Sequence, residues 1–145
     1  PGGAIEPSLK PLEVALTAGA TFVAQGFSTD IKELTAMIEA GLNHKGFSFI
    51  NVFSPCVTYN KVNTYDWFKE NLTKLADIEG YDSSNREMAM QTVMRHEGLV
   101  TGIIYQDTET TSYQDKIKGY SELPLTDIDI SLSEDQFDQL IKEFM

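Results

Sequence analysis

TFVAQG, residues 21–26, and KGFSFINVF, residues 45–53, are the two stretches that decide the fold class. The first is a β-branched and aromatic run that ends at Gly26, which predicts a buried strand. The second is apolar at five of the seven positions from Phe47 to Phe53 without strict alternation. That pattern predicts a strand covered on both faces, as in a parallel sheet.

The segment between these two runs has the period of a helix. Its apolar residues recur at helical spacing, and Asp30 and Glu33 are spaced as a capping box. His44, Lys45 and Gly46 end it. The apolar stripe consists of Ile31, Leu34, Met37, Ile38 and Leu42. Strand, helix and strand together predict a βαβ unit with a right-handed crossover.

Outside this unit the chain alternates between further helices and one more strand. Pro11 opens a short helix that Gly19 stops, and Leu99 to Tyr105 reads as a strand. Helices are predicted from Thr64 (with Tyr65, Phe68, Leu72 and Leu75 on one side), from the capping-box spacing Ser84 to Glu87, and from Ser133 with Gln136 (Phe137, Leu140, Ile141 and Phe144). Residues 106–130 read as a surface loop. We expect one α/β domain over residues 1–145, a mostly parallel sheet of about three or four strands with flanking helices.

Composition excludes several classes of function. The formal charge of −11 would repel a phosphate backbone, so we expect no nucleic-acid partner. No run approaches the roughly 20 apolar residues of a membrane span, and the start lacks the features of a secretory signal, so a cytoplasmic protein is expected. A single cysteine fits a reducing compartment. Because the chain begins with Pro1, we expect it to be cut from a longer protein.

The residues alone supply one candidate for chemistry, Cys56. Motifs for dinucleotides, phosphate loops, zinc hydrolases and serine hydrolases are absent from the sequence. His44 and His96 each fall in the last turn of a predicted helix, where a cation complements the helix dipole. Cys56 follows a predicted strand through Ser54 and Pro55, at the end where open parallel sheets bind ligands. From position alone an inert thiol is favoured over a metal ligand or a catalytic nucleophile.

Two longer stretches carry a resemblance to a known family. Residues 16–26 (LTAGATFVAQG) and 44–60 (HKGFSFINVFSPCVTYN) resemble the β subunits of 2-oxoacid:ferredoxin oxidoreductases, and Pro1-Gly2-Gly3 and Gly102 to Tyr105 are also similar. The resemblance covers the C-terminal half of such a subunit. It implies a thiamine-diphosphate-binding fold and oxidative decarboxylation of a 2-oxoacid with coenzyme A, giving an acyl-CoA, carbon dioxide and reduced ferredoxin. The implied partners are an α subunit and ferredoxin, and 2-oxoglutarate and pyruvate are equally compatible substrates.

The resemblance also implies what this chain lacks. The Gly-Asp-Gly stretch and the Asn that hold magnesium and diphosphate in the family are absent, so no catalytic or thiamine-diphosphate-binding residue is assigned. The chain alone is expected to be inactive and to bind no cofactor. In members with a [4Fe–4S] cluster, the cysteine of the Ser-Pro-Cys segment corresponds to Cys56 and is the fourth ligand. With the resemblance included, Cys56 is expected to be a metal ligand.

Two other classes of function stay open at this point. A stand-alone flavodoxin-like binding or signalling domain would fit the length and the fold class, but it does not account for Ser54-Pro55-Cys56. A transketolase-like thiamine decarboxylase would not need Cys56.

Overall fold

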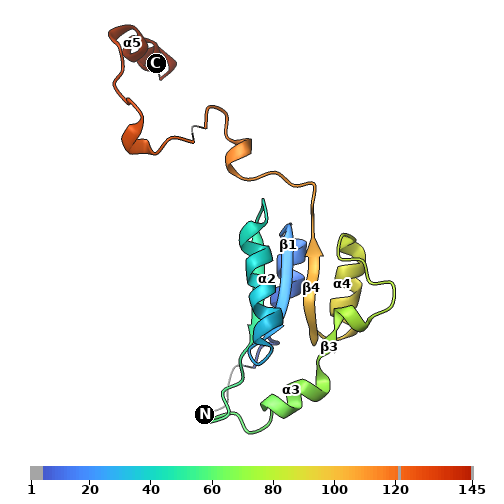
Figure 1. Ribbon diagram of the computed structural model, residues 1–145. Coiled ribbons are helices and arrows are strands. Elements are labelled where there is room, and N and C mark those ends of the chain that lie inside the picture. Colours follow the sequence, from blue (N-terminus) through green and yellow to red (C-terminus); the bar gives the residue numbers. More distant parts are fainter. Residues whose placement is uncertain (1–4, 121, 145) are drawn as a thin grey trace. The chain divides into compact units, whose positions relative to one another are not determined.

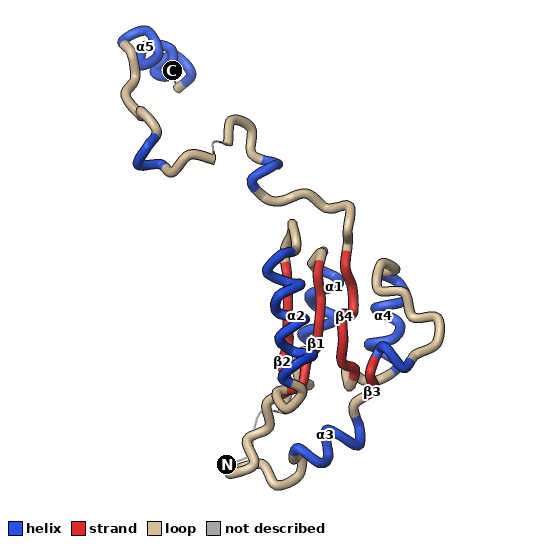
Figure 2. The backbone as a smooth tube through the Cα atoms, viewed as in Figure 1, coloured by secondary structure: helices blue, strands red, loops and turns tan. Residues whose placement is uncertain are grey.

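The computed structural model describes residues 5–120 and 122–144, so Pro1-Gly2-Gly3 of the resemblance lie outside the described residues. The chain divides into two compact units, Pro1–Tyr113 (unit 1) and Gln114–Met145 (unit 2). Unit 1 holds the sheet and most of the helices, and unit 2 holds one further helix (Figures 1 and 2).

The sheet of unit 1 has the strand order β2-β1-β4-β3. Its strands are β1 (Phe22–Phe27), β2 (Ser48–Phe53), β3 (Thr73–Lys74) and β4 (Val100–Gln106). β1 pairs with β2 in parallel, from Phe22 opposite Ser48 to Phe27 opposite Phe53. β3 and β4 are also parallel, whereas the central pair of β1 and β4 is antiparallel. The predicted mostly parallel α/β sheet is confirmed; the antiparallel centre was not predicted.

Helices cover both faces of this sheet. Alternation along β1 turns Val23 toward α1 (Pro11–Thr17) and α4 (Arg86–Arg95), in one apolar cluster with Leu16, Val93 and Ile104. Phe22 and Ala24 point the other way, toward Met37 of α2 (Ile31–Asn43). Figure 1 shows α2 alone on its side of the sheet. The βαβ unit predicted from residues 21–53 is therefore present as β1, α2 and the parallel strand β2.

Two glycines let α2 lie close to the strands. A Cβ atom at Gly26 of β1 would lie 2.8 Å from Cδ1 of Leu34, and one at Gly41 of α2 would lie 2.8 Å from Cδ1 of Ile50. Real Cβ atoms do not approach other atoms so closely, so a side chain at either position would force Leu34 or Ile50 to shift. The two glycines leave room for these side chains between α2 and the strands.

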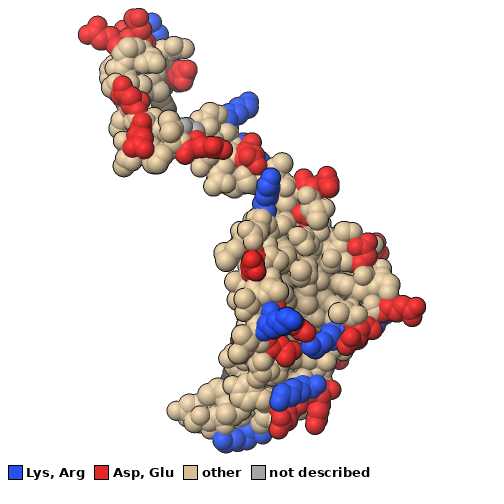
Figure 3. All heavy atoms as spheres, in the orientation of Figure 1, with Lys and Arg blue, Asp and Glu red and all other residues tan. Residues whose placement is uncertain are grey.

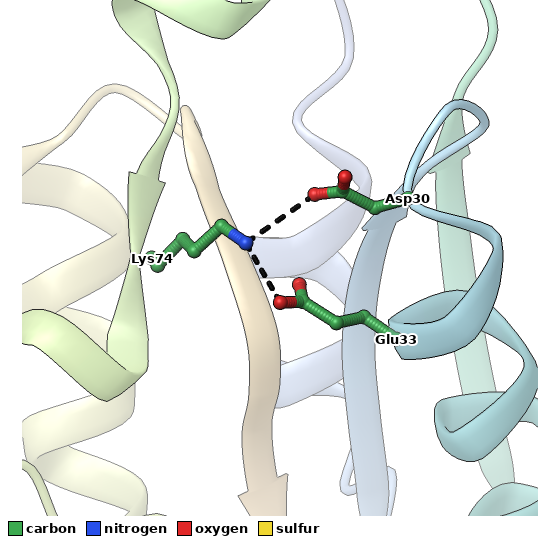
Figure 4. A network of polar contacts seen from close by, with 3 residues as sticks. All are labelled: Asp30, Glu33 and Lys74. Carbon is green, nitrogen blue, oxygen red and sulfur yellow. Dashed lines mark hydrogen bonds and ion pairs between the residues drawn. The ribbon is translucent and has the colours of Figure 1, made fainter.

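The capping box predicted for Asp30 and Glu33 is not formed. Asp30 is the N-cap of α2, but its side chain makes no cap hydrogen bond. Both carboxylates instead meet Lys74 of β3, whose Nζ lies 3.4 Å from Asp30 Oδ2 and 2.7 Å from Glu33 Oε1 (Figure 4). Lys74 thus competes with the backbone N–H groups of α2 for these carboxylate oxygens, and its ion pairs join the start of α2 to β3.

β2 is covered on both faces, as predicted, since Phe49 packs against the cluster of α1 and α4 and Ile50 packs on the side of α2. As the end strand of the described sheet, β2 is only half-buried. Two other sequence expectations need correction. α3 (Tyr65–Asn71) begins one residue after its predicted start, Thr64, which is its N-cap. It ends before Leu72, and the chain continues into β3 and the 3-10 turn η1 (Leu75–Asp77). The cap of α4 is Asn85, whose side chain accepts a bond from the Met88 amide, and not Ser84.

Unit 2 contains the helix that the sequence predicts after Ser133, preceded by a segment without strands. It contains 3-10 turns at Gln114–Lys116 and Leu125–Asp127, and then α5 (Glu134–Glu143). The Ser133 and Gln136 capping box is formed with both of its hydrogen bonds, at 3.3 and 3.0 Å. No described residue of α5 is buried. Of the helices in the described ranges, none has the length and apolarity to cross a membrane.

Candidate functional site at the carboxyl edge of the sheet

β1 and β2 end side by side because they are parallel, at Phe27 and Phe53, and the antiparallel β4 begins at the same edge with Val100. We call this end of the sheet the carboxyl edge. Ligands of open α/β sheets bind at such an edge, because loops and helix ends gather there. Here the loop of residues 54–64 (the Cys56 loop), α3 and the turn of residues 96–99 gather at it.

The Cys56 loop is held by its own hydrogen bonds. The Asn60 amide donates to the Cys56 carbonyl at 2.9 Å, and Asn60 Oδ1 accepts from the amides of Val62 and Asn63 at 2.9 and 3.0 Å. Lys61 Nζ donates to the Val57 carbonyl at 2.6 Å. These bonds fix the path of the backbone directly after β2, where the sequence places Cys56, and leave that cysteine exposed with a free thiol. The predicted position of Cys56, directly after the second strand, is found.

An aromatic cluster fastens α3 to the carboxyl edge. The ring of Phe68 lies 4.8 Å from that of Phe53 and 5.7 Å from that of Phe27, so it bridges the ends of β2 and β1. Trp67 meets Phe68 edge-on at 5.0 Å. Phe53, Pro55, Cys56, Asn60 and Phe68 line one hollow of about 450 Å³. Cys56 therefore lines a hollow whose wall includes the rings of Phe53 and Phe68.

A second cavity adjoins the first and is built on a polar chain that crosses the sheet. Asn51 Nδ2 donates to Gln25 Oε1 at 2.6 Å, and Gln25 Nε2 donates to the carbonyls of Gly98 and Val100 at 2.6 and 2.7 Å. Gln25 is only 1% exposed, so these bonds satisfy its whole amide. They hold the turn in which Glu97 has a φ of 52°.

This second cavity measures about 600 Å³ and shares Asn51 and Phe53 with the hollow beside Cys56. Sequence reasoning did not single out Gln25 or Asn51 as site residues. The available signal was their polarity, since Gln25 is the one polar side chain of β1 and Asn51 stands among Phe49, Ile50, Val52 and Phe53 of β2. The carboxyl edge thus offers two cavities that share Asn51 and Phe53, an exposed thiol and amide groups.

The described part of the chain does not bring a complete metal site together. Among residues 5–120 and 122–144, no group of three or more His, Cys, Asp or Glu side chains could hold an ion. His44 and His96 are the C-caps of α2 and α4, as their sequence positions predicted, and His44 Nε2 lies 2.9 Å from Thr21 Oγ1. Cys56 could serve a metal only together with ligands from elsewhere.

Comparisons of sequence and of structure find similarity to the same group of proteins, the β subunits of 2-oxoacid:ferredoxin oxidoreductases. Residues 56–122 match the family that is described as the C-terminal part of the pyruvate ferredoxin oxidoreductase beta subunit. A 2-oxoacid:ferredoxin oxidoreductase subunit beta of Sulfolobus sp is 32% identical over 127 residues, which cover 81% of this chain and 42% of that subunit. The KorB subunit of the 2-oxoglutarate synthase of Methanocaldococcus jannaschii is 41% identical over 59 residues, 41% of this chain and 22% of that subunit.

A solved structure extends the likeness to the fold. It is the 2-oxoglutarate:ferredoxin oxidoreductase of Magnetococcus marinus with 2-oxoglutarate, coenzyme A and succinyl-CoA bound. It is 34% identical with a TM-score of 0.67, over 75% of this chain and 37% of the solved chain. The present chain therefore spans about two fifths of the length of the relatives it matches. Both comparisons favour these oxidoreductase subunits over a stand-alone flavodoxin-like domain.

Proposed function

We propose that this chain, being similar in sequence and in fold to the C-terminal part of 2-oxoacid:ferredoxin oxidoreductase β subunits, forms that part of such a subunit. The observation that carries the proposal is the structural match, because sequence identity and fold agree over the same three quarters of the chain. The complete subunit would work with an α subunit in the cytoplasm. It would oxidise a 2-oxoacid, with coenzyme A as acyl acceptor and ferredoxin as electron acceptor.

The cofactors proposed for the complete complex are thiamine diphosphate with Mg²⁺ and a [4Fe–4S] cluster. Bound thiamine diphosphate supplies the carbanion that decarboxylation of a 2-oxoacid requires. The described residues hold no group of three or more His, Cys, Asp or Glu side chains that could bind Mg²⁺, and the sequence lacks the Gly-Asp-Gly stretch, so we assign no residue to this cofactor. The proposed role of this chain is to shape the carboxyl edge of the sheet.

Cys56 is the residue we propose as one ligand of the cluster. The fit rests on chemistry and position: a thiolate is the ligand that iron–sulfur clusters use, and this thiol is exposed at the carboxyl edge on a hydrogen-bonded loop. The remaining three cysteines would come from elsewhere in the complex, since the sequence has one cysteine. Asn60 would position Cys56 through the loop backbone.

The proposal is tested with the full β subunit purified anaerobically with its α subunit. The complex should reduce ferredoxin only when a 2-oxoacid and coenzyme A are both present, and 2-oxoglutarate and pyruvate are compared as substrates. A Cys56→Ser complex should lose iron and ferredoxin reduction while it keeps thiamine diphosphate, because oxygen replaces thiolate poorly at iron. Ser54→Ala, two residues away in the same loop, is the control and should keep both.

Each result bears on a separate part of the proposal. A wild-type complex that fails to oxidise any 2-oxoacid would refute the assignment of function. Normal iron content in the Cys56→Ser complex would refute the ligand role alone and return Cys56 to an ordinary exposed thiol.

A further inference from the structure

β2 lies at one end of the sheet and has no neighbouring strand on its outer side among the residues that the structure describes. The carbonyls of Phe47 and Phe53 accept hydrogen bonds from amides on the β1 side, at 3.1 and 2.9 Å. Because successive residues of a strand direct their backbone groups to opposite edges, Ile50 and Val52 direct theirs away from β1. The outer edge of β2 therefore offers backbone donors and acceptors to a further strand.

β2 has none of the features that usually keep an exposed edge strand from pairing. Edge strands that face water are commonly very short, charged, bulged or interrupted by proline. β2 is six residues long (SFINVF), carries no charge and no proline, and pairs with β1 in an unbroken register. Phe49 and Ile50 point to opposite faces, and each packs against an apolar cluster. A strand of this kind is typical of the interior of a sheet.

Helix α2 carries apolar residues past the same edge. Gly41 faces the sheet beside Ile50, whereas the side of α2 that carries Glu33 lies toward β3, where Glu33 meets Lys74 (Figure 4). At 3.6 residues per turn, three large apolar residues lie on the opposite side of α2 from Glu33, toward β2 and beyond it. Unit 1 leaves Ile31, Ile38 and Leu42 exposed by 71%, 41% and 82%. A strand added beside β2 would contact this side of α2.

The length of the related subunits supplies a source for this strand. The chain spans 42% of the Sulfolobus subunit and 37% of the solved chain, and residues 56–122 match the C-terminal part of such subunits. On the function proposed above, more of the subunit precedes this chain than the chain itself contains. A segment of the same polypeptide has an effective concentration on the order of millimolar at the edge, which favours it over a separate protein.

Other occupants fit the edge less well. Unit 2 has no strand in its described part, and the pairing that leaves β2 at the end of the sheet is internal to unit 1. A second copy of the chain brings the same net charge of −11, and carboxylates are spread over the face shown in Figure 3. Pairing between two copies is therefore opposed by charge repulsion. A strand of the α subunit would have to displace the covalently attached segment.

We propose that a strand from the preceding part of the β subunit pairs with the outer edge of β2 and packs against Ile31, Ile38 and Leu42 of α2. This inference rests on the function proposed above, since it takes the chain to be the C-terminal part of a longer subunit. The added strand would also border the hollow beside Cys56, because Val52 lines that hollow. β2 is then an interior strand of the complete subunit.

Amide hydrogen exchange tests whether the edge is covered. The full-length β subunit is exchanged into heavy water within its α/β complex, and exchange is resolved residue by residue by mass spectrometry. The outward amides of Ile50 and Val52 should exchange as slowly as the inward amides of Phe49 and Asn51, which are internal controls. Exchange at Ile50 and Val52 on the order of 100-fold faster than at these controls would show an open edge and overturn the proposal.

A photo-crosslink identifies the occupant. Benzoylphenylalanine replaces Leu42, the most exposed of the three α2 residues, in full-length α/β complex prepared from a mixture of heavy-isotope-labelled and unlabelled β subunits. The expected products join position 42 to peptides that precede Pro1 in the same β subunit. Products with residues 114–145, with the α subunit, or between labelled and unlabelled β subunits would overturn the proposal.

A substitution tests whether α2 is covered in the complete subunit. Leu42→Ala should lower the melting temperature of the full-length complex by several degrees, because the proposal buries a side chain that unit 1 leaves exposed. Glu39→Ala, on the side of α2 away from the sheet, is the control and should shift it by less than about one degree. Equally small shifts for both variants would contradict the contact.

The outcomes separate this inference from the proposed function. A complex that oxidises a 2-oxoacid but exchanges the Ile50 and Val52 amides rapidly refutes the added strand and leaves the function standing. A complex that oxidises no 2-oxoacid refutes the function, whereas slow exchange and crosslinks to the preceding part would still support the strand.

Discussion

Arg86 joins parts of unit 1 that are about 70 residues apart in sequence. Its two terminal nitrogens donate to the carbonyls of Leu16 and Ala20 at 2.7 and 2.8 Å, just where α1 ends. Its guanidinium lies 4.1 Å above the ring of Tyr105. One side chain thus satisfies carbonyls at and beyond the C-terminal turn of α1 and stacks on β4, which anchors α4 to both.

Replacing Arg86 should cost more stability than its partial exposure suggests. Arg86→Met keeps the packing stem but leaves two carbonyls without their donor, and we expect the free energy of unfolding to fall by about 2–3 kcal/mol. Urea unfolding followed by circular dichroism measures it. Arg95→Met, at the exposed end of the same helix, is the control and should change stability by less than about 0.5 kcal/mol. Equal effects of the two substitutions would contradict this role.

Tyr81 makes the free energy of unfolding fall as the pH rises above 10. Burial, with a smaller contribution from the charge of Asp82, raises the pKa of Tyr81 from 10.0 to about 12, and its hydroxyl donates to the Ile104 carbonyl. Because the folded pKa is above the unfolded one, this stabilisation is complete below pH 10 and is lost between pH 10 and about 12. Unfolding free energy should therefore fall across that window.

The contribution of Tyr81 is isolated by substitution. Tyr81→Phe should be less stable than wild type below pH 10, and the difference should shrink toward pH 12. Tyr59→Phe, whose ring is exposed, should follow the wild-type curve. A Tyr81→Phe curve parallel to wild type at every pH would show that the hydroxyl does not titrate with folding.

At the scale of elements, α3 is held mainly by Phe68. Its ring contacts the rings at the ends of both β1 and β2, whereas Tyr65 contacts only Phe27, at 6.1 Å, and no residue of α3 is fully buried. Phe68→Ala should lower the free energy of unfolding by about 1.5–3 kcal/mol, less than a fully buried Phe would lose. It should also loosen the Cys56 loop, so alkylation of Cys56 should become several times faster.

Alkylation with iodoacetamide under native conditions checks this link between α3 and the loop. Tyr59→Ala removes an exposed ring from the same loop and should leave both stability and alkylation rate close to wild type. An unchanged alkylation rate in Phe68→Ala would mean that the hydrogen bonds of Asn60 position Cys56 without help from α3.

Lys74 links two other elements, β3 and α2. A hydrogen bond with Glu33 is the largest cause that raises the pKa of Lys74, but the three charged groups are all more than 40% exposed. Exposed pairs are screened, so Lys74→Met should cost only about 0.5–1 kcal/mol. The loss should vanish in 1 M NaCl. A loss that persists there would indicate that the aliphatic stem of Lys74, and not its charge, holds β3 in place.

At the scale of the whole molecule, exposed apolar surface favours self-association, whereas the net charge of −11 disfavours it through repulsion. Phe47 is 66% exposed beside the edge strand β2, and Met94 is 56% exposed on α4. We expect this chain, separated from its partners, to self-associate at high concentration, and more so in high salt, where charge repulsion is screened. Sedimentation velocity measures it, and Phe47→Ser should reduce the association. A monomer at every concentration and salt would contradict the expectation.

The sequence by itself determined the elements whose signals are local. Pro11 and Gly19 delimit α1, Thr64 caps α3, and the Ser133 and Gln136 box begins α5, because each signal acts within a few residues. The place of Cys56 after β2 follows from the same local reading. So does the resemblance to the oxidoreductase β subunits, which resides in contiguous residues. The role of Cys56 as a ligand stays a prediction, as does folding of residues 1–145 as a single domain.

Only the tertiary structure decided what depends on residues far apart in the chain. The antiparallel pairing of β1 with β4, the chain from Asn51 through Gln25 to Gly98, and the capture of the Asp30 and Glu33 carboxylates by Lys74 each join segments dozens of residues apart. A capping-box spacing cannot reveal a competing cation from another strand. The spacing of residues in a sequence indicates which hydrogen bonds a segment can form by itself. Which partner a side chain binds in the folded protein depends on the groups that folding brings within bonding distance.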